Sequence, residues 1–354
     1  MRTIFSPNYS DSNPYIANVI SILNNLGIET YDFKDIKKGK IKVSEIEIAN
    51  LNWYDNFNSK SLIKTIFDTI KRVAVITYLK INDVEIFYTF HNKTAHDGFH
   101  PAFNRYLHNY LIRKSNKVLL LNEKSRQYIV NAIGEAKAKE KCFFVGHPLY
   151  HNETIYGPKS SKELIFLFFG AIRPYKNVEL LINAWSTAKI DNAKLIIVGK
   201  PFNSEYKKSI ESLCQGKSDI KLILEFVPEE QLTSLIAASD IIVAPLQKTS
   251  SMNSSTLMKA VCSGKNIVIP AIDMASDFGL ENMFSYDYND ENSHMEELEK
   301  ELKVAAETYF KYPQMYENMT NRLHQNVLFN YSDEAIKDRY HKVYYEMRKH
   351  RKKI

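Results

Sequence analysis

Short apolar segments alternate with amphipathic helical segments along most of this 354-residue chain. Strands of a parallel sheet are covered on both faces, so they read as short, continuous apolar runs. Strands that alternate with helices build parallel sheets through right-handed crossover connections. The sequence therefore predicts an α/β protein made of doubly wound parallel sheets.

A polar stretch with several turn-forming residues, 151–161, divides the alternation into two runs. Strands of the first run are expected at residues 3–6, 29–33, 45–51, 85–91, 117–121 and 142–146. Strands of the second run are expected at residues 164–169, 194–198, 220–225, 241–245 and 267–270. Only helical patterns follow residue 290. We therefore expect two Rossmann-like domains facing a cleft, 1–155 and 156–330, and a final helix with a basic tail, 331–354.

Composition and absent motifs exclude several classes of protein. The chain has three scattered cysteines, which are too few for a disulfide framework or a zinc site. We interpret them as small core residues of a protein in a reducing cytoplasm. It has no glycine-rich dinucleotide motif and no P-loop. It shows no secretory signal and no apolar run of membrane-spanning length. We expect a cytoplasmic protein that is not an integral membrane protein.

Positive charge is concentrated in the first half of the chain. Residues 1–155 carry 21 Lys and Arg against 15 Asp and Glu, and the tail at 348–353 is also basic. Such a surface suits an anionic partner, such as a membrane leaflet or nucleic acid, although it also serves ordinary solubility. Helical segments 61–79 and 101–117 interleave basic and apolar residues. This pattern occurs in helices that lie in a membrane interface and, more often, in helices that face the core of a protein.

Two cations follow the apolar run 164–169. A turn at Gly170 comes first, then Arg173 and Lys176, and an amphipathic helix begins at Val178. Ligands of α/β proteins bind at the carboxyl edge of the sheet, where these residues are expected. Two cations beside a helix N-terminus suit a diphosphate. A solvated basic loop is the alternative.

A second polar cluster follows the strand that ends at Pro245. Its residues from Asn253 to Thr256 lead into a helix, whose first N–H groups are open to an anion. A plain N-cap needs only one of these hydroxyl groups, so the cluster favours phosphate or sugar binding. Asp287 and Asp290 look like a metal-binding pair, but we interpret them as a solvated turn. No metal site is expected.

The order of these segments resembles the donor half of the family 4 glycosyltransferases. The resemblance is carried by residues 168–177, 194–199, 226–232, 238–245 and 263–268. It implies the GT-B fold, a nucleotide-sugar donor, no metal and no cofactor. The first half is similar more loosely, at 13–15 and 89–92, and Ser332-Asp333 fits before a final helix that packs back on the first domain.

The chain departs from the family at two positions. The family usually carries two glutamates, eight positions apart, that contact the donor sugar and the nucleotide ribose. Those positions are Ser251 and Lys259 here. A branch of the family has a Ser/Thr-Gly-Ser-like loop instead, which residues 253–256 resemble. Diphosphate binding is thus expected, and the residue that recognises the ribose is open.

The resemblance implies a set of site residues. His91, at a strand end, is expected against the donor sugar and forms the catalytic set with Arg173 and Lys176; its alternative role is to cap the strand. The expected donor-binding residues are Gly170, Arg173, Lys176, Gly199, Val227, Asn253, Ser254, Ser255 and Thr256. The expected acceptor-binding residues are Asn13, Asn92, His96 and Asp97.

We expect a metal-independent glycosyltransferase that moves a sugar from a UDP- or GDP-linked donor to a glycan or lipid-linked glycan, in surface polysaccharide or glycoconjugate synthesis. By resemblance the reaction retains anomeric configuration. The expected partners are these substrates and an anionic membrane surface on the inner face of the cell membrane, and not nucleic acid. The alternatives are a nucleotide-sugar epimerase of the same fold, an inverting transferase with Asp97 as base, and an inactive partner of another transferase.

Overall fold

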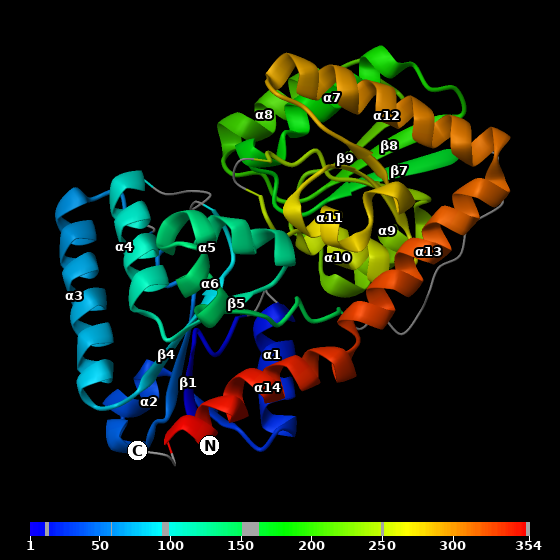
Figure 1. The fold of residues 1–354 in the computed structure, drawn as a ribbon. Coiled ribbons are helices and arrows are strands. Elements are labelled where there is room, and N and C mark those ends of the chain that lie inside the picture. Colours follow the sequence, from blue (N-terminus) through cyan, green and yellow to red (C-terminus); the bar gives the residue numbers. More distant parts are fainter. Residues whose placement is uncertain (11–13, 58, 94–98, 151–162, 249–250, 352–354) are drawn as a thin grey trace. The chain divides into compact units, whose positions relative to one another are not determined.

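The computed structural model describes all residues except 11–13, 58, 94–98, 151–162, 249–250 and 352–354 (Figure 1). The chain divides into two compact units. The first unit is Met1–Tyr150 with Asn330–Ile354, and the second unit is His151–Phe329. The first unit is therefore built from two separate pieces of chain.

The first unit contains a six-stranded parallel sheet with the order β2-β1-β3-β4-β5-β6. Its strands are β1 (Arg2–Ser6), β2 (Glu29–Tyr31), β3 (Ile48–Asn52), β4 (Glu85–Phe90), β5 (Lys117–Leu120) and β6 (Cys142–Phe144). The strand order reverses between β1 and β3. Neighbouring loops diverge at such a point, which leaves room for ligands at the carboxyl ends of the strands.

Helices cover both faces of this sheet. They are α1 (Pro14–Asn25), α2 (Phe33–Lys37), α3 (Leu62–Ile81), α4 (Pro101–Lys114), α5 (Arg126–Ile133), α6 (Glu135–Lys141) and α14 (Asp333–Arg351). Helices α3, α4, α5 and α6 pack side by side, and α14 packs on α1 (Figure 1). The α14 contact is specific, because Tyr344 meets Phe87 with ring centroids 5.1 Å apart and its hydroxyl accepts a hydrogen bond from Asn50 Nδ2 at 3.0 Å.

The second unit contains a six-stranded parallel sheet with the order β12-β11-β10-β7-β8-β9. Its strands are β7 (Leu164–Phe169), β8 (Ala193–Val198), β9 (Ile220–Ile223), β10 (Ile241–Val243), β11 (Asn266–Pro270) and β12 (Phe284–Tyr286). After β9 the chain returns to the other side of β7. The switch point, where nucleotide ligands bind in sheets of this kind, therefore lies between β7 and β10.

Helices also cover both faces of the second sheet. They are α7 (Val178–Ala188), α8 (Ser204–Leu213), α9 (Glu229–Ala238), α10 (Ser255–Cys262), α11 (Asp273–Phe278), α12 (Glu291–Lys311) and α13 (Pro313–Tyr331). Helices α7, α8 and α12 lie on one face, and α9, α10 and α11 on the other (Figure 1).

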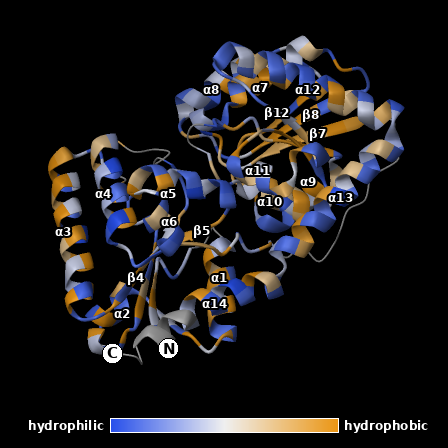
Figure 2. Cartoon of the chain, in the orientation of Figure 1, coloured by the Kyte–Doolittle hydropathy of each residue, from blue (hydrophilic) through white to orange (hydrophobic). Residues whose placement is uncertain are grey.

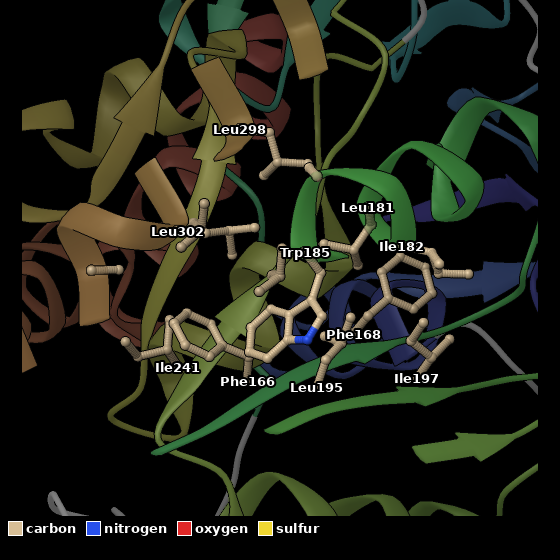
Figure 3. Packing of buried hydrophobic residues seen from close by; sticks show 14 of the residues in the cluster. Phe166, Phe168, Leu181, Ile182, Trp185, Leu195, Ile197, Ile241, Leu298 and Leu302 are labelled. Atoms are coloured by element: carbon tan, nitrogen blue, oxygen red, sulfur yellow. The ribbon is translucent and has the colours of Figure 1, made fainter. Parts of the chain in front are cut away.

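The core of the second unit is densely apolar. Trp185 of α7 lies among side chains of the sheet and of α12 (Figure 3). Its ring meets Phe166 edge to face, with centroids 5.2 Å apart, and its indole N–H donates to the Asp219 carboxylate at 2.7 Å. The buried indole thus keeps a hydrogen-bond partner, which fixes the helix that follows the Arg173–Lys176 loop.

Two six-stranded parallel sheets confirm the predicted fold class. Several elements were not predicted, namely β12, α2, α6 and α11. The strand expected at 29–33 is shorter, because Asp32 caps α2: its side chain accepts from Lys34 N at 2.9 Å, and its backbone N–H donates to Asp35 at 2.9 Å. Local capping here ends the strand early.

Candidate functional site

Two glycine turns bring the loops after β7 and β8 together. Gly170 has φ +119° and Gly199 has φ +152°, both in the region that side chains rarely adopt. A Cβ at Gly199 would lie 1.8 Å from the Gly170 carbonyl oxygen. This close approach lets both loops run side by side past the carboxyl edge of the sheet.

Arg173 lies in this paired stretch. Its backbone is extended, and its guanidinium carbon lies 5.2 Å from the centroid of the Phe202 ring in the neighbouring loop. Ile172 donates its N–H to the Lys200 carbonyl at 3.0 Å, which holds the two loops in register. An arginine supported in this way is pre-organised for an oxyanion.

Lys176 is the most informative side chain of the site. It is half-buried, and its ammonium nitrogen lies 5.7 Å from the centroid of the Tyr175 ring. Burial is the cause that lowers the pKa of Lys176 to about 8. No carboxylate pairs with this ammonium within the part of the chain that the structure describes. A desolvated cation without a counterion is suited to bind an anion from solution.

The loops after β7 and β10 are joined by hydrogen bonds. Asn177, in the left-handed conformation at φ 52°, donates its side-chain amide to the Pro245 carbonyl at 2.8 Å. The backbone N–H of Gln247 donates to the Tyr175 carbonyl at 3.2 Å. The loops after β7 and β10, which lead into the two polar clusters, are therefore joined at the switch point of the sheet.

The start of α10 divides its hydroxyl groups between different roles. Ser254 is buried and its hydroxyl accepts from Leu257 N at 3.1 Å, the ordinary contact of an N-cap. Thr256 is also buried, whereas Ser255 is exposed and Asn253 half-buried. Ser254 thus acts as a helix cap, and anion binding by the remaining backbone N–H groups of the first turn stays a prediction.

The two positions that carry glutamates in the resembled family differ in their surroundings. Ser251 is buried, and its N–H donates to Gln247 O at 3.0 Å. The side chain of Lys259 is only 12% exposed and its ammonium pairs with the carboxylate of Glu229, the first residue of α9. That carboxylate is 65% exposed. Val227, two residues before it, is half-buried. Glu229 was not predicted as a site residue, since the pair joins two helices 30 positions apart in sequence.

The segment 287–290 is an exposed turn apart from the half-buried Tyr288, and its side chains also contact the loop after β10. The Tyr288 ring stacks on His294 with centroids 3.8 Å apart, and its hydroxyl accepts from Lys248 N at 2.8 Å. Asp287 pairs with the Lys248 ammonium, and Asp290 caps α12. The turn therefore anchors the loop after β10, because stacking and capping both favour one conformation.

His91 follows β4 in the first unit and is buried. Its Nε2 lies 3.0 Å from Asn52 Oδ1, and its ring stacks on Trp53 at 3.8 Å between centroids. Burial, with a smaller contribution from His147, holds the pKa of His91 well below its usual range. His91 is therefore neutral near pH 7, and a catalytic role for it remains a prediction.

The acceptor-binding residues are only partly described. Asn92 follows His91 and is half-buried. Asn13, His96 and Asp97 lie outside the described residues. The predicted acceptor set therefore remains a prediction, and the first unit offers a different group of polar side chains, Asp55, Asn104 and His108.

The described residues show neither a cluster suited to a metal ion nor a helix suited to span a membrane. Among them, no group of three or more His, Cys, Asp or Glu side chains is arranged to hold a metal ion. None of their helices is both long enough and apolar enough to cross a bilayer.

Sequence comparison finds a family match in the part of the chain that holds the β7 and β10 loops. Residues 155–278 match the family model described as glycosyl transferases group 1. The GDP-mannose:glycolipid 4-beta-D-mannosyltransferase of Xanthomonas campestris pv. campestris is 31% identical over 104 residues. That match covers 29% of this chain and 29% of the Xanthomonas protein, so it concerns less than a third of either.

Solved structures share the fold over nearly the whole chain. HepE of Anabaena, solved in complex with UDP and glucose, has a TM-score of 0.68 at 13% identity and covers 97% of this chain and 99% of its own. Sucrose-phosphate synthase of Thermosynechococcus elongatus has a TM-score of 0.69 at 12% identity, with 98% of both chains covered. TarM of S. aureus, with a TM-score of 0.60 at 17% identity, covers 87% of this chain, which spans 57% of TarM. The fold is therefore that of the GT-B glycosyltransferases.

Proposed function

We propose that the protein is a glycosyltransferase that moves a sugar from a nucleoside-diphosphate donor to a glycan or lipid-linked glycan, in surface polysaccharide or glycoconjugate synthesis. The observation that carries the proposal is the Lys176 ammonium, half-buried and without a carboxylate partner among the described residues, at the switch point of the second sheet. The family match over residues 155–278 supports it.

The proposed chemistry uses the protein's own cations. We propose that Arg173 and Lys176 contact a diphosphate bound at the α10 N-terminus and stabilise the charge that develops on it as it departs. The N–H groups of the first α10 turn supply further donors. We propose that transfer needs no metal and retains anomeric configuration, with a leaving phosphate oxygen accepting the proton of the acceptor hydroxyl.

Incubation with a panel of nucleotide sugars tests the proposal. GDP-mannose is the first donor to try, because the mannosyltransferase relative carries that name. Acceptor-dependent release of GDP or UDP, unchanged by EDTA, supports transfer without a metal. An epimerase releases a free sugar without any acceptor, and an inactive partner releases nothing. NMR of the product linkage tells retention from inversion.

We further propose that Glu229 recognises the nucleotide ribose. Lys259 holds its carboxylate at the start of α9 while leaving it exposed. Acidic side chains bind ribose hydroxyls in Rossmann-like sites. Glu229→Gln should weaken GDP and UDP binding roughly tenfold, the scale of a hydrogen bond to a charged group. Glu230→Gln, one position on, is the matched control and should bind normally.

Calorimetry with 2′,3′-dideoxy nucleotides separates ribose recognition from a general loss of affinity. The wild-type protein should bind the dideoxy nucleotide more weakly than the parent nucleotide, and Glu229→Gln should bind both alike. An equal loss for both nucleotides in Glu229→Gln would mean that Glu229 does not touch the ribose.

The first unit has an apolar face that fits a membrane surface. In the first half of helix α3 the buried side chains are threonines, Thr65 and Thr69. The large apolar side chains face outward, with Ile63 69% and Phe67 68% exposed. Figure 2 shows apolar residues along this helix. Exposed Lys64 and Lys71 lie on the same helix. We propose that this face, with the basic charge of the first unit, docks on an anionic leaflet.

Co-sedimentation with lipid vesicles tests the docking. Binding to anionic vesicles should exceed binding to neutral ones and decrease at high salt. Phe67→Glu should lose most of the binding, because burial of a phenylalanine contributes about 1.5–3 kcal/mol. Tyr312→Glu, an exposed aromatic of the second unit, is the control. Equal sedimentation of Phe67→Glu and wild type would exclude α3 as the contact.

A further inference from the structure

Two neighbouring strands of the first sheet carry polar side chains where a buried strand is usually apolar. Asn50 and Asn52 lie two positions apart on β3, and Thr89 and His91 do so at the end of β4. Residues two apart on a strand point to the same face of the sheet. These four side chains, the polar row, have exposed fractions between 0% and 7%. Burying so many polar groups is costly unless they bond to one another.

Hydrogen bonds join the polar row in one direction. The Asn50 amide nitrogen donates to the Tyr344 hydroxyl of α14 at 3.0 Å. Its amide oxygen accepts from the Thr89 hydroxyl at 2.9 Å and from the Asn52 amide nitrogen at 3.4 Å. With its nitrogen toward Asn50, Asn52 has its amide oxygen toward His91, 3.0 Å from Nε2.

The contact with Asn52 selects one tautomer of His91. An amide oxygen can only accept, so a hydrogen bond at 3.0 Å requires the proton on Nε2. The ring is neutral near pH 7, because burial holds the pKa of His91 well below its usual range. A neutral imidazole carries one ring proton, so its lone pair is then on Nδ1. Asn52 therefore determines which ring nitrogen donates and which accepts.

Aromatic neighbours hold the plane of the same ring. Trp53 stacks on His91 with centroids 3.8 Å apart and planes 19° apart, and Tyr15 of α1 meets it edge to face at 5.0 Å. Trp53 has φ +48°, a rare conformation for a bulky side chain. Such conformations persist where the surrounding structure constrains them, and they concentrate at functional sites. This packing opposes a half-turn of the imidazole, which would move Nε2 away from Asn52.

We propose that Asn52 is a positioning residue that holds His91 in the neutral tautomer with the proton on Nε2 and the lone pair on Nδ1. Asn50 holds Asn52 in turn, and both act on a substrate only through His91. The tautomer is a property of the folded chain and stands without the proposed function. Its effect on sugar transfer rests on that function.

Nitrogen-15 NMR of the whole protein, labelled at histidine, tests the tautomer directly. A protonated ring nitrogen and one with a lone pair resonate far apart, and couplings to the ring carbon protons tell Nδ1 from Nε2. The chain has ten histidines, so the signals lost in His91→Gln identify His91. The wild type at pH 7 should carry the His91 proton on Nε2, whether or not it transfers a sugar. A proton on Nδ1, or an even mixture of tautomers, overturns the proposal.

Asn52→Leu keeps the size of the side chain and removes the acceptor. His91 should lose its preference for the Nε2 proton, and turnover should fall roughly tenfold or more, because the wrong tautomer cannot make the contacts of the right one. GDP and UDP affinity should not change, since the diphosphate is proposed to bind in the second unit. An unchanged tautomer in Asn52→Leu would exclude Asn52 as the positioning residue.

Thr3→Val is the matched control for a general loosening of the sheet. It removes a buried hydroxyl of β1 that donates to the Ile48 carbonyl at 2.9 Å, outside the polar row. The variant should lose stability and keep the wild-type tautomer of His91. If Thr3→Val alters the tautomer as far as Asn52→Leu does, the role of Asn52 is structural and the proposal is wrong.

Asn52→Asp keeps both the shape and the acceptor, so it should restore the tautomer that Asn52→Leu loses. A carboxylate beside the imidazole favours the charged ring, so the pKa of His91 should rise. Two titratable neighbours, His147 and Tyr15, stay neutral near pH 7, because burial lowers the pKa of His147 to about 4 and raises that of Tyr15. Turnover of Asn52→Asp should approach that of wild type at high pH and fall as pH decreases through the raised pKa. Identical pH profiles for Asn52→Asp and wild type would mean that position 52 does not control His91.

Discussion

Lys176→Met is expected to weaken the binding of GDP, UDP and inorganic pyrophosphate by roughly ten- to a hundredfold, the scale of hydrogen bonds to charged groups. Methionine keeps the length of the side chain and removes only the charge. Turnover should fall at least as far, because the leaving diphosphate gains charge in the transition state. Calorimetry and product-release assays measure the two effects.

The pH dependence gives this prediction a definite sign. Because burial lowers the pKa of Lys176 to about 8, the ammonium loses its proton above that pH, and diphosphate affinity should decrease as pH rises past 8. Diphosphate binds more tightly to the protonated ammonium than to the neutral amine, so bound diphosphate raises the pKa of Lys176. Lys176→Met should bind weakly and without this dependence. A variant with wild-type affinity across the range would remove Lys176 from the site.

Stability should change in the opposite direction. A lysine whose pKa is lowered in the folded protein holds its proton more tightly when unfolded. The free energy of unfolding therefore rises with pH between about 8 and the ordinary lysine pKa, and the charged form lowers stability near pH 7. Ligand-free Lys176→Met should melt no lower than wild type, and a large fall in Tm would indicate a structural role instead.

Gly199→Ala is expected to destabilise the protein by more than about 3 kcal/mol, because a methyl group at φ +152° must displace a neighbouring backbone. The added Cβ would lie 1.8 Å from Gly170 O. Denaturant unfolding measures the loss. Where the variant still folds, diphosphate affinity should also fall, since the displaced loop carries Arg173.

Gly216→Ala provides the matched control. Gly216 also has a positive φ, +78°, but a Cβ there would meet nothing within 4 Å. Gly216→Ala should therefore lower the free energy of unfolding only by the strain of a positive φ at alanine, about 1–2 kcal/mol. Similar losses for both variants would mean that the contact between the two glycine turns does not constrain the loops.

Apolar runs were sufficient to predict most strands of both sheets. Residues 164–169 form β7 with the predicted bounds, since six apolar residues in succession suit a strand covered on both faces. The three-residue strand β12 was not predicted, because its neighbours Asp287 and Asn289 made the region look like a turn. What stabilises it is tertiary: Val268 pairs with Phe284 across β11 and β12.

The candidate site was predictable only where it depends on chain order. Arg173 and Lys176 follow a strand closely, so the sheet edge determines their place. The hydrogen bond of Asn177 to Pro245 spans 68 positions, and Glu229 reaches Lys259 across 30. Asn104 gave no local signal, because the fact that its buried amide has no hydrogen-bond partner among the described residues depends on how the interior packs. Pairings of this kind are visible only once the chain is folded.

The discontinuity of the first unit has a consequence for biosynthesis. Residues 151–329 are translated before α14, so the first unit lacks one helix until all of the second unit has been made. Until Tyr344 arrives, Phe87 and Asn50 lack their partner on that helix. We infer that the first unit, although it begins the chain, keeps apolar surface uncovered until the residues of the second unit and then of α14 have been translated.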